Sequence, residues 1–84
     1  MKTIELKTWK EFFQQTWLGV KAFELRKDDR NYEEGDILIL REWDQYNNCY
    51  TGRQVTRRVD YVLKFASPEF GLAPGYAILG VIPV

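Results

Sequence analysis

"GDILILREWDQYNNCYTGRQVTRRVDYVL", residues 35–63, predicts a long β-hairpin, and this hairpin decides the fold. Gly35-Asp36 is a turn signal, and the four residues that follow form a continuous apolar run rich in β-branched side chains. A run of that length is typical of a strand covered on both faces, as in a small closed barrel. Residues 41–43 continue the strand, and the turn formers of residues 44–52 separate it from a second arm.

The second arm of the hairpin alternates in polarity over its whole length, which predicts a strand with one face toward the core. One face is expected to carry Val55, Arg57, Val59, Tyr61, Leu63 and Phe65, and the other Gln54, Thr56, Arg58, Asp60, Val62 and Lys64. Arg57 and Val62 are the two exceptions to the alternation.

The segment before the hairpin predicts a short strand at residues 4–7, followed by a helix. Thr8 and Glu11 have the spacing of a capping box, so the helix is expected to begin near Trp9 and to end near Gly19. An aromatic stripe follows at helical spacing: Trp9, Phe12, Phe13, Thr16, Trp17 and Val20. Most stripes of this kind pack into a core, and a binding platform is the alternative.

The remaining segments complete a β-α-β-β-β-β order. Residues 21–27 alternate as a half-buried strand, residues 66–75 read as a loop, and residues 76–84 form a last apolar strand. We therefore expect one domain over residues 1–84, of α+β and mostly β class. Its mixed, strongly twisted sheet can close on itself, with one helix packed at its side.

Composition limits the classes of function. Twelve Lys and Arg balance twelve Asp and Glu, so the chain lacks the net positive charge of strong nonspecific nucleic-acid binders. Acids nevertheless dominate residues 28–44 and bases residues 53–64. With no histidine and one cysteine, Cys49, the usual zinc sites, an internal disulfide and Ser-His-Asp or Cys-His catalysis are excluded, and we expect no metal and no cofactor.

The hydropathy pattern predicts a cytoplasmic protein without membrane contact. No stretch approaches the ~20 apolar residues of a membrane span, and the first residues lack the apolar run of a signal peptide.

The stretch GVKAFELRKDDR, residues 19–30, concentrates charge and holds the candidate site. Glu24 and Arg26 share a strand face, and Lys21 lies at the start of the strand, so the three side chains can converge at a cleft mouth. A carboxylate between two cations suits a nucleobase or nucleotide, with the carboxylate accepting from an amino group and the cations contacting phosphate or carbonyl oxygen. An ion-pair lattice on an exposed strand edge is the alternative.

Gly19-x-Lys21-x-x-Glu24-x-Arg26, followed by Gly35-Asp36 and the apolar run 37–40, resembles the activating signal cointegrator homology (ASCH) domain. Nearly the whole chain is similar to a small bacterial and phage family of uncharacterised ASCH-like proteins. The resemblance implies a small mixed β-barrel of the PUA-like (pseudouridine synthase and archaeosine transglycosylase) group with one packed N-terminal helix. It also implies RNA or modified-nucleotide binding in a cleft where Lys21, Glu24 and Arg26 lie, with Lys27 and Arg30 in a basic extension.

Three functions compete on this basis. The leading one is a nucleic-acid or modified-nucleotide binding module, with Arg57, Arg58 and Lys64 as secondary contacts and a shallow salt dependence. The second is an amidohydrolase acting on acylated cytidine, as some ASCH-like domains are. Those enzymes carry a Thr where this chain has Glu24, so catalysis is not expected; if it occurs, Glu24 would be the general base and Lys21 or Arg26 would stabilise the oxyanion. The third is a protein-interaction adaptor that uses Trp43, Tyr46 and Tyr50.

Overall fold

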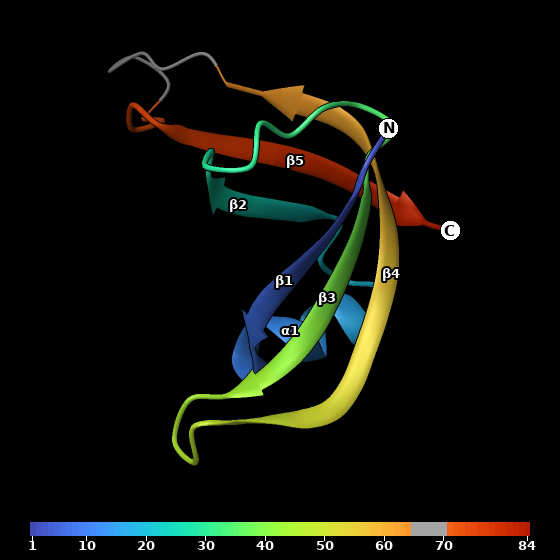
Figure 1. Ribbon diagram of the computed structural model, residues 1–84, viewed down its shortest axis with the longest axis vertical. Coiled ribbons are helices and arrows are strands. Elements are labelled where there is room, and N and C mark those ends of the chain that lie inside the picture. Colours follow the sequence, from blue (N-terminus) through green and yellow to red (C-terminus); the bar gives the residue numbers. More distant parts are fainter. Residues whose placement is uncertain (65–70) are drawn as a thin grey trace.

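A computed structural model describes residues 1–64 and 71–84, and these form one short helix and five strands (Figure 1). The elements are β1 (Thr3–Trp9), α1 (Lys10–Trp17), β2 (Phe23–Lys27), β3 (Ile37–Asp44), β4 (Cys49–Leu63) and β5 (Tyr76–Pro83). The mostly β, α+β class expected from the sequence is confirmed. Residues 65–70 lie outside the described residues, and they include Phe65 of the expected strand and the first part, 66–70, of the expected loop.

The five strands form one sheet in the order β1-β3-β4-β5-β2. β1 is parallel to β3, and the other neighbours are antiparallel. The sheet curls into a half-barrel, with β1 and β2 as its two edges (Figure 1). β4 runs through both halves, because it pairs with β3 as far as Arg58 and with β5 from Arg57 onward.

The core lies inside the curl and takes alternate residues from β1, β3 and β5, with Val59 from β4 and Tyr32 from the segment between β2 and β3. Its buried members are Ile4, Leu6, Tyr32, Leu38, Leu40, Val59, Ala77, Leu79 and Val81. The apolar run 37–40 was expected to be covered on both faces. Leu38 and Leu40 are fully buried, whereas Ile37 and Ile39 are only half-buried, because they lie on the outer face of the open sheet.

Both exceptions in the β4 pattern have a local structural cause. The register between β4 and β5 shifts between Val59 and Tyr61, and this bulge exchanges the two faces of the strand beyond it. Val62 therefore packs against the core and Tyr61 is exposed, which reverses the assignment expected for these two residues. Arg57 lies on the inner face, where its Nη2 donates to the Thr16 carbonyl at 3.0 Å, at the end of α1.

The helix start differs from the sequence prediction. β1 continues to Trp9, which pairs with Trp43, so Thr8 is held in an extended, buried position and α1 begins at Lys10. The expected capping box is absent at this helix end, and the Glu11 carboxylate instead accepts from the Gln45 amide and the Tyr46 hydroxyl. The end of the helix is as expected, because Gly19, at φ +78°, donates its N–H to the Thr16 carbonyl.

The aromatic stripe of α1 is only partly core. Phe13 and Thr16 are buried between the helix and the sheet, as expected. Trp9, Phe12, Trp17 and Val20 are exposed over about half of their surface or more, so the expected burial is wrong for these four. A helix of two turns covers too little of the sheet to bury so wide a stripe. Among residues 1–64 and 71–84, no helix is long and apolar enough to cross a membrane.

Candidate binding cleft

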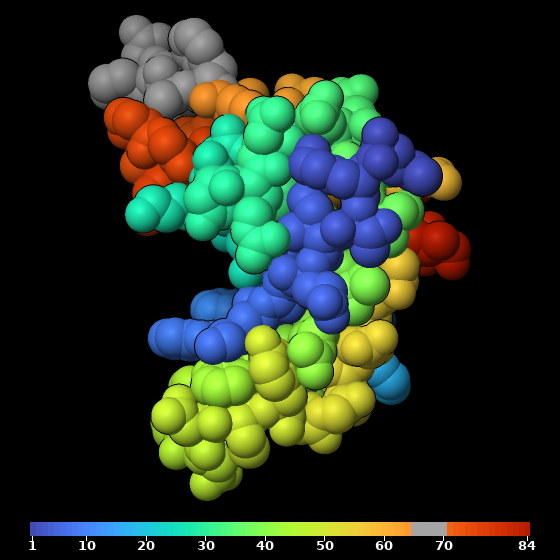
Figure 2. All heavy atoms as spheres, in the orientation of Figure 1, coloured from blue at the N-terminus to red at the C-terminus, as the bar shows by residue number. Residues whose placement is uncertain are grey.

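A cleft of about 600 Å³ opens between the two edges of the sheet, where β1 and α1 face β2. Figure 2 shows the hollow in the surface between the blue of β1 and α1 and the blue-green of β2 and the segment after it. The cleft is lined by Lys7, Thr8, Trp9, Phe12, Lys21, Phe23, Glu24, Leu25 and Arg26. The three charged residues of the sequence motif, Lys21, Glu24 and Arg26, therefore converge in one concave site.

Glu24 is the centre of this charged group. Its side chain is 2% exposed and accepts from both cations: Lys21 Nζ lies 2.5 Å from Oε2, and Arg26 Nη2 and Nε lie 2.8 and 3.0 Å from Oε1. A buried carboxylate requires such partners, since an unpaired charge out of water is costly. Glu24 therefore holds both cations in fixed positions at the base of the cleft.

Arg26 also bridges the two edges of the sheet. From β2, its Nη1 donates to the Lys7 carbonyl at 3.0 Å and its Nη2 donates to the Thr8 hydroxyl at 2.9 Å, both on β1. The planar guanidinium suits this role because its donors point in several fixed directions. Thr8, expected as a helix cap, thus belongs to the site, and its burial in β1 is what directs its hydroxyl toward Arg26.

The orientation of β2 is the reverse of what an amphipathic strand suggests. Glu24 and Arg26 pair with Leu79 and Ala77, whose side chains are in the core, so the charged face points inward. Phe23 and Leu25 are instead exposed at the rim of the cleft. The alternative of an ion-pair lattice on an exposed strand edge is wrong for Glu24, because the mutual pairing of three charges allows the carboxylate to be buried.

The cleft combines unused cationic donors with exposed aromatic rings. Lys21 Nζ uses two of its three protons, on Glu24 and the Phe23 carbonyl, and Arg26 Nη1 uses one of its two. Trp9, Phe12 and Phe23 are each about half exposed around these groups. A ligand with a flat ring and an anionic group matches both features.

Residues 3–81 match the family described as a domain of unknown function, DUF3850. The chain belongs to the DUF3850 family. It is also 47% identical over 58 residues to a protein of Escherichia phage P2, described as an uncharacterised 12.9 kDa protein in the GpA 3' region. That match covers 69% of this chain and 51% of the relative, so the chain spans about half of the relative's length.

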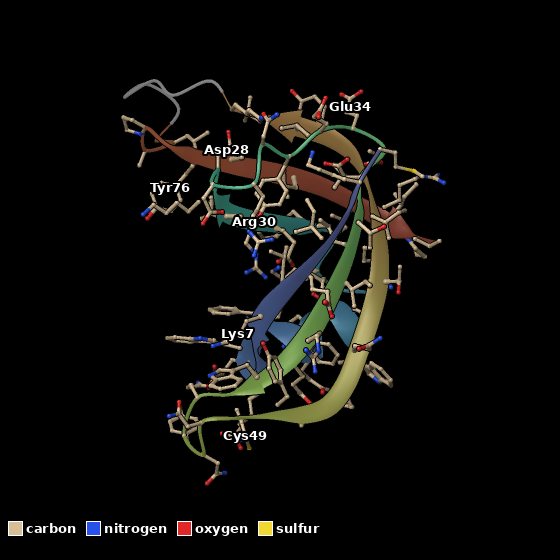
Figure 3. All side chains as sticks on the ribbon, in the orientation of Figure 1. Lys7, Asp28, Arg30, Glu34, Cys49 and Tyr76 are labelled. Carbon is tan, nitrogen blue, oxygen red and sulfur yellow. The ribbon has the colours of Figure 1, made fainter. Side chains whose placement is uncertain are left out.

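The other basic residues predicted for the site of this DUF3850 chain lie outside the cleft. Lys27 and Arg30 are exposed at the end of β2 and in the segment after it, where Figure 3 labels Arg30. Arg58 is exposed on β4, and Arg57 donates to the Thr16 carbonyl at the end of α1. Lys64 pairs with Asp28 at 3.4 Å. The structure thus brings Lys21, Glu24 and Arg26 together in the cleft and places the other predicted basic residues outside it.

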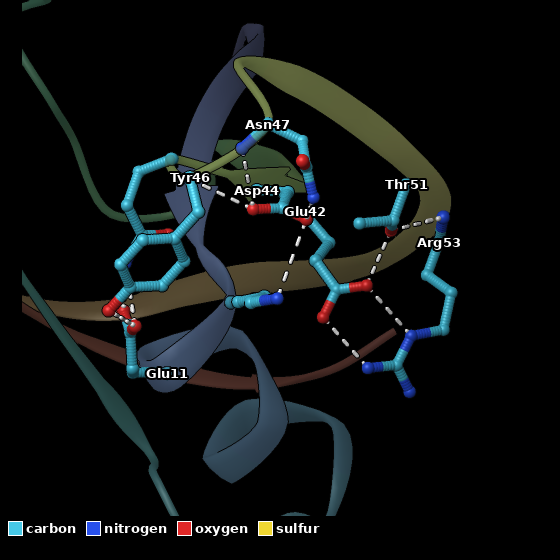
Figure 4. Close-up of polar contacts among 9 residues, drawn as sticks. Glu11, Glu42, Asp44, Tyr46, Asn47, Thr51 and Arg53 are labelled. Carbon is cyan, nitrogen blue, oxygen red and sulfur yellow. Dashed lines mark hydrogen bonds and ion pairs between the residues drawn. The ribbon is translucent and has the colours of Figure 1, made fainter.

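A second buried carboxylate lies between α1 and the β3–β4 hairpin of the DUF3850 chain. Glu42 accepts from Arg53 Nε at 2.9 Å and Nη2 at 2.8 Å, and from the Thr51 hydroxyl (Figure 4). Hydrogen bonds from Arg53, partly opposed by burial, lower the pKa of Glu42. Arg53 also donates to Gln14 Oε1 and lies over the Phe13 and Trp17 rings. This pair was not predicted from the sequence, where its only signal is two opposite charges on facing strands.

Asp44 anchors the turn of the same hairpin. Its carboxylate accepts from the Asn47 amide at 2.8 Å and from the backbone N–H groups of Tyr46 and Asn47 at 3.0 and 3.1 Å (Figure 4). The Asn47 side chain and these N–H groups lower the pKa of Asp44 to about 2. This is a local hydrogen-bonded turn, and it fixes the end of the hairpin beside Glu11 and α1.

Proposed function

We propose that the cleft binds a nucleotide unit of RNA or a modified nucleotide, with its base against the aromatic rim and its phosphate on Lys21 and Arg26. The observation that carries this proposal is the placement of two cations, fixed by a buried carboxylate, among half-exposed aromatic side chains. Exposed aromatic rings beside cationic groups are the features with which proteins bind single-stranded nucleic acid.

The aromatic residues supply the base-binding part of the proposal. Phe12 on α1 and Phe23 on β2 lie on opposite sides of the cleft, and Trp9 is the last residue of β1. Stacking of a base on such a ring contributes about 1–3 kcal/mol and tolerates any sequence. Rings that serve only to pack a core would be buried, so the exposure of these rings around one cleft favours a ligand with a flat ring.

The cations supply the phosphate-binding part. Lys21 and Arg26 keep unused donors toward the cleft, and their hydrogen bonds to Glu24 restrict their motion before a ligand binds. Glu24 is too deeply buried to contact an amino group of the base directly. Its role in this proposal is therefore to position Lys21 and Arg26, and Lys27 and Arg30 contribute only to the surrounding field.

The half-barrel and its cleft also support the finer assignment to the ASCH domain and the PUA-like group. The motif residues that the resemblance places in a cleft are the residues that line this one. We extend the proposal to that group on these grounds, with the curled sheet and the N-terminal helix α1 as supporting features.

The hydrolase alternative receives less support from the geometry. Glu24, which would be the general base of such a hydrolase, already accepts from three N–H donors, and the nearby Thr8 hydroxyl accepts from Arg26. A general base needs an oxygen within reach of the proton that it removes. Incubation with acylated cytidine tests this alternative, and cytidine release that is lost in Glu24→Gln would replace binding by catalysis as the proposed function.

The binding proposal predicts that removal of a rim ring weakens RNA binding without unfolding the protein. Phe12→Ala should reduce affinity for a labelled oligouridylate by about tenfold at low salt, measured by fluorescence anisotropy. Tyr61→Ala is the matched control, since Tyr61 is 56% exposed and Phe12 is 55% exposed, but only Phe12 lines the cleft. Equal affinities of the two variants, or no binding by the unaltered protein, would contradict the proposal.

A further inference from the structure

Three aromatic residues form a row across neighbouring strands on the outer face of the sheet. Trp9 on β1 pairs in register with Trp43 on β3, and Trp43 pairs with Tyr50 on β4. The inward residues of β1 and β3 are the even-numbered ones, so Trp9 and Trp43 point away from the core. The adjacent row on the same face places Lys7 beside Arg41.

The two cations of the second row lie over the rings of the first. Lys7 Nζ is 3.9 Å from the centre of the Trp43 ring, and Arg41 Cζ is 4.0 Å from that of Tyr50. The Trp43 and Tyr50 rings meet edge to face at 4.9 Å. The single acidic contact of Arg41 within the described residues is with Glu5, at 4.0 Å, so the positive charge of this face is weakly neutralised.

This row is continuous with the cleft. Trp9 and Lys7 belong to both, because they line the cleft and also begin the two rows (Figure 3 labels Lys7). Strands lie about 4.8 Å apart, so the row from Trp9 to Tyr50 spans about 10 Å. At the ~3.4 Å rise of one nucleic-acid strand, that length corresponds to about three stacked bases.

We propose that the row Trp9, Trp43 and Tyr50, with Lys7 and Arg41, extends the cleft into a path for single-stranded nucleic acid. The inference rests on the proposed function of the cleft and names its ligand more narrowly: a polynucleotide chain rather than a free nucleotide. Bases lie against the rings of the row, and the following phosphates lie near Lys7 and Arg41.

Charge complementarity favours this ligand over a protein partner. Both cations lie over rings, and their one ion pair among the described residues, Arg41–Glu5, is long at 4.0 Å, so both remain able to attract phosphates. The continuity of the row with the cleft adds a second argument, because a polynucleotide bound in the cleft has to leave the cleft along a neighbouring surface. The edge formed by β1 supplies such an exit directly onto the row.

The experiment compares the affinity for a mononucleotide with the affinity for an oligonucleotide. Tyr50→Leu should weaken binding of an oligouridylate of about ten nucleotides by about fivefold or more and leave uridine monophosphate binding unchanged. Tyr76→Leu is the matched control, because Tyr76 is 40% exposed on β5 and Tyr50 is 41% exposed. Arg41→Gln should reduce the salt dependence of oligouridylate binding by about one phosphate contact, a slope change of ~0.7.

The outcomes separate this inference from the proposed function. If Phe12→Ala weakens binding of both ligands but Tyr50→Leu and Arg41→Gln bind the oligouridylate normally, the path is wrong and the cleft stands. Equal losses for the mononucleotide and the oligouridylate in Tyr50→Leu would also overturn the path, since they show an effect through the fold. If Phe12→Ala changes neither ligand, the proposed function itself fails.

Discussion

Two buried glutamates with arginine partners define two regions of this protein, and they differ in how their partners reach them. Glu24 in the cleft pairs with Lys21 and Arg26, three and two residues away on the same short segment. Glu42, between α1 and the hairpin, pairs with Arg53, which is eleven residues away on the neighbouring strand. The first group is assembled locally, and the second requires the hairpin to be closed.

The two regions also differ in the further contacts that their cations make. Arg53 completes its contacts on Gln14 and the rings of Phe13 and Trp17, so it ties the hairpin to the helix. Lys21 and Arg26 retain donors toward an open cleft. The same chemical pair thus serves to join elements in one region and to present charge in the other. Variants at the two glutamates test this distinction.

Glu24→Ala is expected to have the largest effect on stability. It leaves Lys21 and Arg26, whose side chains are only 15% and 21% exposed, without their carboxylate, and breaking a buried pair in this way costs about 3–5 kcal/mol. The free energy of unfolding measured in urea should fall by that amount, and oligouridylate binding by the folded fraction should weaken. The control Glu34→Ala removes an exposed carboxylate (Figure 3) and should change stability by less than about 0.5 kcal/mol.

Glu42→Ala is expected to have a smaller effect on stability and none on binding. Arg53 is 39% exposed and regains water when its partner is removed, so the loss should be about 1–2 kcal/mol. Urea unfolding measures the loss, and fluorescence anisotropy should give the affinity of the unaltered protein. Weaker oligouridylate binding in this variant, with the fold intact, would contradict the division of roles between the two regions.

Asp44→Asn is expected to lower stability near neutrality and to make stability less dependent on pH in acid. The pKa of Asp44 in the folded protein is about 2, below its ordinary 3.8. Asp44 therefore stabilises the fold fully above the ordinary value, and this contribution is lost as pH falls through the folded value. The decrease in Tm between about pH 5 and about pH 2 should be shallower in Asp44→Asn, while Glu42 and Asp36, whose pKa values are also lowered, retain part of it.

A pH dependence in Asp44→Asn as steep as that of the unaltered protein would assign the acid sensitivity to other carboxylates. The amide of the variant still offers an oxygen to the Tyr46 and Asn47 N–H groups, so the turn itself should persist.

The sequence predicted the elements better than it predicted which face of each strand or helix is buried. Periodicity located the helix and the strands, because spacing of apolar residues reflects local geometry. It failed for β2, where the polar face is the buried one, since pairing among Lys21, Glu24 and Arg26 changes the cost of burial. It also failed beyond Val59, because a bulge depends on the partner strand and leaves no periodic signal.

The motif and its place in a cleft were predicted, but most of the other residues that line the cleft were not. Lys21, Glu24 and Arg26 were recognised by their types and spacing, and their convergence needs only one short strand and the turn before it. Thr8, Phe12 and Lys7 were not recognised as its neighbours, because they reach it only when the two edges of the sheet approach. Such long-range proximity depends on the curl of the whole sheet.

The long strand β4 has one further consequence for the cleft. Its pairings with β3 and with β5 overlap at Arg57 and Arg58, so the two halves of the sheet are joined at a short length of one strand. The edges β1 and β2 belong to different halves and lie far along the sheet from that junction. A change in the twist of β4 there would move the two edges relative to each other, and the hydrogen bonds from Arg26 to Lys7 and Thr8 oppose that movement at the cleft.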